Sequence, residues 1–394
     1  MFIETKQKRG NIAEVKKYSV TVKIILAFCW AYYVKTHDIR IVEAKEVKKA
    51  LECYGYKNGC FVYYCNCCNN YILQSLGCNS RLCSCCGKRH ADSWAVDLSK
   101  RMFKVPHRHL VISIASELWP YLDGNWPLLK VYMDSAIDAL NDYLPKIMGD
   151  DFIRVGVIVI LHTFGKDMKF QPHLHLIMTE GGFDSLGKFI PRVYLHADGF
   201  AKCWKYHVCT NLCKAGIPFE VTNWCFHNKR FYVWVHKDGR IRHPIAIARY
   251  LGRYVRHPAI ANSRIDSFDK ENMTVGFHYE NHEKKRQYVV MTANDFISAL
   301  IGHIPPSNFK LIRHYGAYAR RTKKMFKQHL QSSIEQTKLM RFGVEMPRRI
   351  LRCPYCGEKE LGFVMYLKKP SKPPPVDKED IGYWIESLKG KAGI

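Results

Sequence analysis

The amino-acid sequence predicts an α+β protein with a central antiparallel sheet, flanking helices, an N-terminal zinc-binding module and helical, basic extensions. Three observations support this class. Apolar, β-branched runs of strand length recur from about residue 107 to about residue 305. Helical apolar spacing appears between these runs, as in "LLKVYMDSAIDALNDYL". Nine cysteines crowd into residues 53–86, ahead of the first run.

Composition and charge narrow the possible functions. With 394 residues, of which 47% are hydrophobic and 24% charged, the chain has an ordinary globular balance and can bury a sizeable core. Lys and Arg outnumber Asp and Glu by 61 to 35, and the formal net charge is +26. This excess is spread along the whole chain, so it attracts polyanions. Nucleic acid is the expected partner, and an acidic membrane or ribosome contact is the alternative.

Residues 1–50 are expected to form a helical, basic N-terminal region. The opening "MFIETKQKRGN" has no apolar signal core, and the run "VTVKIILAFCWAYYV" is about 15 residues long and interrupted by Lys23. A run of this length is too short to span a bilayer, so it predicts a buried helix. We therefore expect a cytoplasmic protein with no membrane partner.

Residues 51–100 are expected to form a zinc-binding domain. Cys65 and Cys68 form one short-spaced pair, and Cys83 and Cys86 form another, with fourteen residues between the two pairs. Two such pairs are typical of four thiolates that hold one tetrahedral zinc, which is structural because no coordination position stays open. Nearby cysteines offer alternative ligands or a second site: Cys53, Cys60, Cys67, Cys78 and Cys85.

Residues 101–310 are expected to hold the sheet. Its predicted strands are the runs "HRHLVISIA", "VGVIVILH", "HLHLIM", "FYVWVH", "MTVGFHY" and "RQYVVMTA". The sequence contains no phosphate-cradling glycine loop of the Walker type, so it shows no ATP-driven motor.

Residues 311–394 are expected to contain a basic segment, a cysteine knuckle and a tail. The stretch "FKLIRHYGAYARRTKKMFKQHL" holds seven Lys or Arg and no acid. The knuckle is "CPYC", formed by Cys353 and Cys356, and the sequence offers it no obvious partner pair. It could be completed by Cys203, Cys209 or Cys213 if one of them folds nearby.

A second candidate metal site lies in "LHTFGKDMKFQPHLHLIMTEGGF". Side chains alternate on a strand, so His173 and His175 face the same way and can bind one cation. His162 ends the run "VGVIVILH" and supplies a third imidazole if the two strands pair. Gln171 is the competing ligand. The cation is Mg²⁺ or Mn²⁺: imidazoles favour Mn²⁺ by affinity, whereas cellular abundance favours Mg²⁺.

Two tyrosines lie four residues apart in "HPIAIARYLGRYVRHPAIA". The proline suits a helix start, and the spacing puts Tyr250 and Tyr254 on one helical face. They either pack on the core or act as nucleophiles, since a tyrosine hydroxyl can attack a phosphodiester when a cation polarises the phosphate. Three arginines are at hand to offset the developing charge: Arg249, Arg253 and Arg256.

In this order, the motifs resemble the two-tyrosine HUH transposases of rolling-circle insertion sequences, the IS91 type. The cysteine module resembles the family's zinc-binding domain, "PHLHLIMTEGGF" its metal motif, "YLGRYVRHPAIANSRI" its nucleophile helix, and "NDFISALIGHIPPSNFKLIRHYGAYARR" the end of its catalytic domain. The resemblance covers most of the chain. It implies nicking of single-stranded DNA at an element end, a 5′-phosphotyrosine, a free 3′-OH, and strand transfer by the second tyrosine.

The resemblance also implies roles for individual residues. Tyr250 and Tyr254 are the expected nucleophiles, and His173 and His175 the expected metal ligands, while His162 as third ligand rests on spacing. Extra cysteines leave the zinc ligands open, and further candidates are Cys53, Cys78, Cys353 and Cys356. The expected DNA contacts are Arg249, Arg253, Arg256, Arg313, Arg320, Arg321, Lys323 and Lys324.

The resemblance further implies a prokaryotic, nucleoid-associated protein. Its expected partners are single-stranded DNA at transposon ends and target, a host helicase, and a second copy of the chain. A rolling-circle replication initiator or relaxase uses the same chemistry, but relaxases usually place the tyrosine before the histidine motif, and here the order is reversed. A non-enzymatic zinc protein that binds nucleic acid is the other alternative, and it predicts binding with no covalent adduct.

Overall fold

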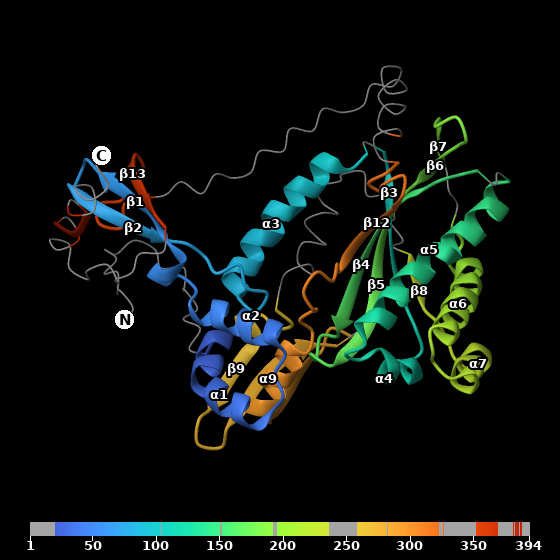
Figure 1. Cartoon of the computed structure of the whole chain (residues 1–394), viewed down its shortest axis with the longest axis horizontal. Helices are drawn as coiled ribbons and strands as arrows, with labels where there is room; N and C mark the ends of the chain where they lie inside the picture. Colours follow the sequence, from blue (N-terminus) through green and yellow to red (C-terminus); the bar gives the residue numbers. More distant parts are fainter. Residues whose placement is uncertain are drawn as a thin grey trace. The chain divides into compact units, whose positions relative to one another are not determined.

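The computed structural model describes residues 20–103, 105–149, 152–191, 195–235, 258–281, 283–322 and 352–368, together with positions 326, 381, 383–385 and 387. These residues form an α+β structure whose sheets are antiparallel (Figure 1). The chain divides into two compact units, Met1–Gly87 with Glu345–Ile394 and Lys88–Val344. Within the described ranges, no helix is long and apolar enough to cross a membrane.

The first unit contains both N-terminal and C-terminal segments. Its elements are α1 (Val22–Thr36), α2 (Ile41–Leu51), the short helix η1 (Tyr56–Asn58), β1 (Cys60–Cys65), β2 (Asn70–Ser75) and β13 (Gly362–Leu367). Helix α1 begins where the Thr21 side chain accepts a hydrogen bond from the Ile24 N–H at 3.2 Å. It coincides with the predicted N-terminal helix, although Phe28 and Tyr32 on one side are exposed. The strands form a sheet in the order β13–β1–β2, so the knuckle segment is joined to the cysteine module.

The second unit is built on a sheet with the order β12–β4–β5–β3–β8. Strands β4 and β5 form a hairpin at its centre, with β5 in the middle position. The strands are β3 (His107–Ser113), β4 (Gly156–Phe164), β5 (Phe170–Thr179), β8 (Val233–Val235) and β12 (Ile312–Gly316).

Side chains of β4 alternate between the two faces of this sheet, and each face packs against a different core. Val159 and Leu161 face a core shared with α5 (Trp126–Met148) and α6 (Ala197–Lys214). Figure 1 shows both helices, with α7 (Phe219–Asn228) beside α6, on one side of the strands. Ile160 points to the opposite face, where the core includes side chains of α3 (Ser84–Arg101). We call the first the helix face and the second the histidine face, because His162 lies on the same face as Ile160.

The remaining elements of this unit connect or flank the main sheet. They are η2 (Ser116–Leu118), α4 (Trp119–Leu122), β6 (Gly181–Phe183), β7 (Phe189–Pro191), η3 (Asn262–Arg264), β9 (Ile265–Asp269), β10 (Thr274–Glu280), β11 (Arg286–Thr292) and α9 (Ala293–Ile301).

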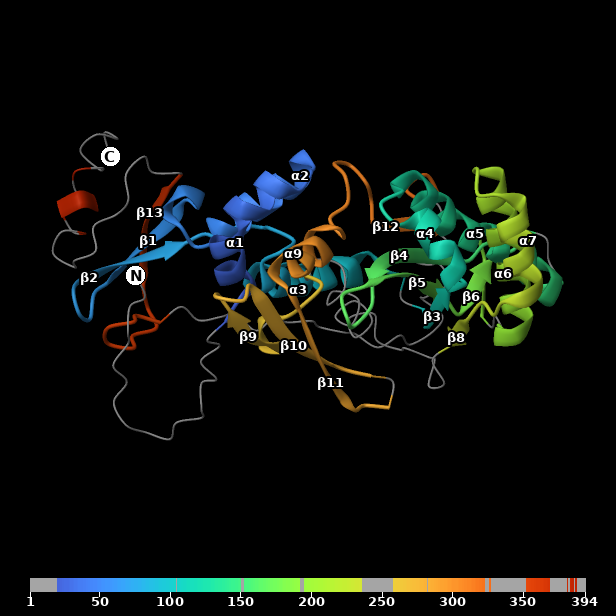
Figure 2. The same cartoon turned by 90° about the horizontal axis from the view of Figure 1, so that it is seen from below.

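The structure corrects one expectation about the sheet. Four of the predicted strand runs become β3, β4, β5 and β8 of the main sheet, but the last two become β10 and β11 of a separate sheet, β11–β10–β9. Figure 2 shows α9 lying against this second sheet. The reason is local, because Phe277 of β10 is buried against Phe296 of α9, with ring centroids 6.3 Å apart. Strand β10 therefore buries its apolar side without the main sheet, whereas Tyr288 and Val290 of β11 are exposed.

The wall of the histidine face contains a buried histidine that makes stability depend on pH. His107 is fully buried, and its Nε2 lies 2.7 Å from the hydroxyl of Tyr318, which accepts a hydrogen bond from the Phe103 N–H. Burial lowers the pKa of His107 from 6.5 to about 4. The unfolded chain therefore takes up this proton first as the pH falls, and the native state loses stability between pH 6.5 and pH 4.

We expect His107→Gln to weaken this acid destabilisation by about 3 kcal/mol at pH 4, because glutamine keeps an acceptor for Tyr318 but does not titrate. Urea unfolding of the variant and the wild type at pH 7.5 and pH 4 measures the difference. His227→Gln, at an exposed position of α7, should leave the acid destabilisation unchanged. Equal acid sensitivity of His107→Gln and the wild type would show that His107 is not the group that titrates.

Candidate metal centres

Four cysteines of the first unit meet where α2 ends and α3 begins. The Sγ atom of Cys53 lies 3.4 Å from that of Cys83 and 3.6 Å from that of Cys86, and Cys78 lies 3.8 Å from Cys86. Thiolates bound to one tetrahedral zinc at about 2.3 Å are about 3.8 Å apart, so these distances fit a shared ion. Hydrogen bonds from the Cys53 and Cys78 thiols lower the pKa of Cys83, which favours the thiolate form that binds zinc.

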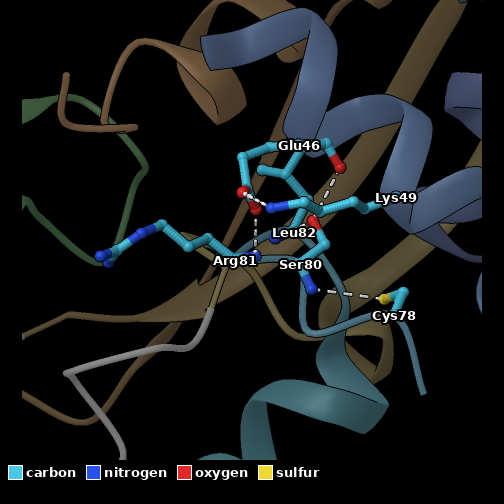
Figure 3. A network of polar contacts seen from close by, with 6 residues as sticks. All are labelled: Glu46, Lys49, Cys78, Ser80, Arg81 and Leu82. Atoms are coloured by element: carbon cyan, nitrogen blue, oxygen red, sulfur yellow. Dashed lines mark hydrogen bonds and ion pairs between the residues drawn. The ribbon is translucent and has the colours of Figure 1, made fainter. Parts of the chain in front are cut away.

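A polar network anchors the loop that carries Cys78 to helix α2 (Figure 3). The Ser80 hydroxyl donates to the Glu46 carbonyl at 2.8 Å, and the Arg81 N–H donates to the Glu46 carboxylate at the same distance. The Ser80 N–H in turn points at the Cys78 sulfur, 3.4 Å away. Lys49 pairs with the other carboxylate oxygen of Glu46. The network therefore ties the Cys78 loop to helix α2.

A second cysteine cluster joins the two sequence ends of this unit. Cys65 ends β1, Cys68 lies in the turn before β2, and Cys353 and Cys356 form the C-terminal knuckle. The Sγ atoms of Cys65 and Cys356 lie 3.6 Å apart, and those of Cys68 and Cys353 lie 3.5 Å apart. The four sulfurs lie within 4.8 Å of one another. This cluster sits at the end of the sheet in which β13 pairs with β1.

Three histidines meet on the central hairpin of the second unit. His162 of β4 lies directly opposite His173 of β5, and His175 lies two residues further along the same face. Their ring centroids are 4.5 to 5.2 Å apart, and one nitrogen from each ring falls within 4.8 Å of the others. A third imidazole was expected only if the two strands pair, and β4 and β5 do pair.

Burial favours the neutral form of two of these imidazoles. It lowers the pKa of His175 far below 6.5, with further lowering from His162, His173 and His109, and burial likewise lowers the pKa of His173. Neutral imidazole is the form that coordinates a metal. His173 and His175 can therefore accept a divalent cation at neutral pH without first losing protons.

Two of the three rings are oriented by neighbours. The carbonyl of Gln171 lies 2.9 Å from His173 Nδ1, and His109 Nε2 lies 3.0 Å from His175 Nδ1. Such partners fix which ring nitrogen is left for a metal. Gln171, the competing ligand from the sequence, thus contacts His173 through its backbone, and its side-chain oxygen lies close to Gly165.

Comparison with known proteins yields two family matches. Residues 25–114 match a family described as "Transposase zinc-binding domain", and residues 156–325 match one described as "Putative transposase". The zinc-binding family is that of IS91-type elements. The chain belongs to the IS91-type insertion-sequence transposases.

Two curated proteins are similar to this transposase over most of its length. The transposase for insertion sequence element IS801 of Pseudomonas savastanoi pv. phaseolicola is 28% identical over 310 residues, which cover 74% of each chain. A protein named "Putative transposase y4qJ", from Sinorhizobium fredii (strain NBRC 101917 / NGR234), is 22% identical over 314 residues, covering 73% of this chain and 78% of its own. No solved structure matches the chain.

The structure separates cysteines that the sequence had grouped. The pair Cys65–Cys68 and the pair Cys83–Cys86 belong to different clusters, so the single zinc site predicted from their spacing is wrong. Pair spacing shows which cysteines share a turn, but it does not show which turns meet. The expected partners of the "CPYC" knuckle are also corrected, because Cys65 and Cys68 complete it, whereas Cys203, Cys209 and Cys213 lie on α6 in the other unit.

Several expected DNA-binding and catalytic residues of the transposase lie outside the described residues. They are Arg249, Tyr250, Arg253, Tyr254, Arg256, Lys323 and Lys324. Arg313 is described, but on the helix face: it pairs with Val159 across β12–β4 and lies over the Phe309 ring at 5.7 Å. Arg320 and Arg321 are exposed in the turn after β12, at the end of the sheet where β4 begins.

The sequence interpretation also missed His109. The signal was present, since "HRH" in a predicted strand places His107 and His109 on one face, as "HLH" does for the metal candidates. The sequence did not show that β3 pairs with β5, and this pairing brings His109 next to His175.

We expect each cysteine cluster of this transposase to hold its own zinc. Cys83→Ser and Cys353→Ser should each lose one zinc ion per chain in native mass spectrometry, and only the second should expose residues 352–368 to limited proteolysis. Cys67→Ser is the matched control, because Cys67 lies between two cluster members but outside both clusters. Loss of both zinc ions from either single variant would contradict two independent sites.

Proposed function

We propose that this transposase nicks single-stranded DNA at the ends of an insertion sequence through a 5′-phosphotyrosine and transfers the strand. The observation that carries the proposal is the group of three imidazoles on the central hairpin of a sheet, in a chain of the IS91 type. A site with three nitrogen donors suits a divalent cation whose remaining positions are open to a phosphate.

The proposed cation ligands are His162, His173 and His175. A divalent ion held there would polarise a scissile phosphate and offset charge that develops on it. Nitrogen donors favour Mn²⁺ over Mg²⁺, and the more abundant Mg²⁺ is the competitor. The chain's own contribution is to favour the neutral form of His173 and His175 by burial and to orient their two rings from Gln171 and His109.

The proposed nucleophiles are Tyr250 and Tyr254, which lie outside the described residues. The phenol oxygen attacks phosphorus, a bond forms between them, and the bond from phosphorus to the 3′ oxygen breaks. The phenol proton leaves to solvent and the 3′ oxygen takes up a proton, so one ester replaces another and no ATP is needed. The position of β8 supports this assignment. This strand precedes the tyrosine segment in the chain, pairs with β3 and places Trp234 6.1 Å from His109, so the chain leaves the sheet close to the histidine group before it reaches the tyrosines.

Affinity for DNA is proposed to come from the basic surplus of the chain. Lys and Arg contacts with phosphates release counterions, which gives binding that does not depend on the metal. Arg320 and Arg321 are exposed and meet this description, whereas Arg313 packs on Phe309 and is better explained as part of the fold. Arg249, Arg253 and Arg256 are proposed to act beside the tyrosines.

A labelled single strand from each end of the encoding element, incubated with the protein and Mn²⁺, tests the proposal on a denaturing gel. We expect wild-type protein to form a covalent adduct, Tyr250→Phe and Tyr254→Phe each to be impaired in full transfer, and the double variant to form none. Phenylalanine keeps the ring volume, so all three should fold. Peptide mapping of the adduct identifies the tyrosine.

His173→Ala in the same assay should abolish cleavage while largely preserving binding of the strand, because binding depends on basic and aromatic contacts. Adduct formation by the double phenylalanine variant at the wild-type rate would refute the nucleophiles. Strand binding with no adduct in any protein would favour the non-enzymatic zinc protein.

His109 is proposed to position His175. Because His109 Nε2 holds His175 Nδ1, His109→Phe should raise the Mn²⁺ concentration needed for half-maximal cleavage roughly 10- to 100-fold, with cleavage recovered at saturating metal. A titration of the cleavage rate against Mn²⁺ measures the shift. His227→Phe, at an exposed site on α7, is the control, and an unchanged Mn²⁺ dependence of His109→Phe would exclude the positioning role.

A further inference from the structure

Helices α5 and α6 carry a group of side chains that neither the cysteine clusters nor the histidine site uses. Asp142 lies on α5, and Cys203 and His207 lie four residues apart on one side of α6. One potential ligand atom from each falls within 4.8 Å of the others. The three residues differ in type, but carboxylate, thiolate and imidazole are the ligands that zinc takes in proteins.

The distances fit coordination of one ion. Asp142 Oδ2 lies 3.2 Å from His207 Nε2 and 3.3 Å from Cys203 Sγ. Zinc bound at about 2.0 Å to oxygen and nitrogen and about 2.3 Å to sulfur separates tetrahedral ligands by about 3.3 to 3.5 Å. Both separations therefore lie close to the edges of such a tetrahedron.

The polar contacts between α5 and α6 at this turn differ from those at the next turn. One turn further along α6, Asn211 donates its amide to Asp138 at 2.7 Å and to Ser135 at 3.1 Å, so acceptors there meet a neutral donor. At Asp142 the helix α6 instead offers a thiol and an imidazole. Lys146 binds the other carboxylate oxygen of Asp142 at 2.7 Å, which leaves Oδ2 as the atom turned to the group.

We propose that Asp142, Cys203 and His207 bind a zinc ion that clamps α5 to α6, with water in the fourth position. Binding releases the Cys203 thiol proton to solvent, and the thiolate, the carboxylate and the neutral imidazole share the ion. The clamp belongs to the helix face of the main sheet, because α5 and α6 pack there, whereas the three histidines point to the other face. It is therefore separate from the proposed nicking chemistry.

Zinc counting by native mass spectrometry of the full chain is the first test. Cys203→Ser and Asp142→Asn should each hold one zinc fewer than the wild type, with both cysteine clusters still loaded. Cys213→Ser is the matched control, since Cys213 lies on the same helix outside the group, and it should keep the wild-type count. Equal counts in Cys203→Ser and the wild type would overturn the proposal and leave a hydrogen-bonded ion-pair network.

Alkylation of the wild-type chain supplies a test that needs no variant. After mild chelation, added Zn²⁺ should protect Cys203 from iodoacetamide in peptide mass maps at least tenfold, while Cys213 stays equally reactive with and without zinc. Zinc that fails to protect Cys203 would also overturn the proposal. Neither measurement involves DNA, so failure here and failure of the proposed nicking can be told apart.

Discussion

The register of the β4–β5 hairpin is the constraint on which the second unit depends. His162 faces His173 only because Leu161 faces Leu174 and Ile160 faces His175. A slip of one residue would send both β5 histidines to the helix face and Leu174 and Leu176 away from α5. Burial of these leucines therefore fixes the metal candidates as firmly as it fixes the core. Much of the free energy that holds the site therefore comes from apolar packing on the helix face, opposite the three histidines.

The first unit is stabilised differently, because its strands are short and come from distant parts of the chain. The β13–β1–β2 sheet has strands of six residues and a small apolar cluster around Val62, Ile381 and Ile385. A small core leaves less free energy to offset the entropy of closing the loop between β1 and β13. Four thiolates from both ends of that loop add to the stability of the unit when they share an ion.

Strand alternation made much of the second unit predictable from the sequence. β3, β4 and β5, the helix α5 and the shared face of His162, His173 and His175 all follow from local apolar periodicity. Nonlocal pairing was not predictable in this way. Spacing gave cysteine pairs but not their partners, because β13 meets β1 through contacts that leave no local pattern. The basic stretch around Arg313 suggested DNA contacts, yet the same alternation places that guanidinium over Phe309 on the helix face.

The composition of the histidine group also constrains how a bound cation could act. Among the described residues, its members are all imidazoles, and no carboxylate belongs to it. Neutral ligands leave the full charge of a divalent ion for a phosphate, but they bind that ion more weakly than carboxylates do. Metal and DNA should therefore stabilise each other at such a site, because the phosphate is itself a ligand. The net charge of +26 makes this arrangement workable, since Lys and Arg can concentrate the strand before the ion is bound.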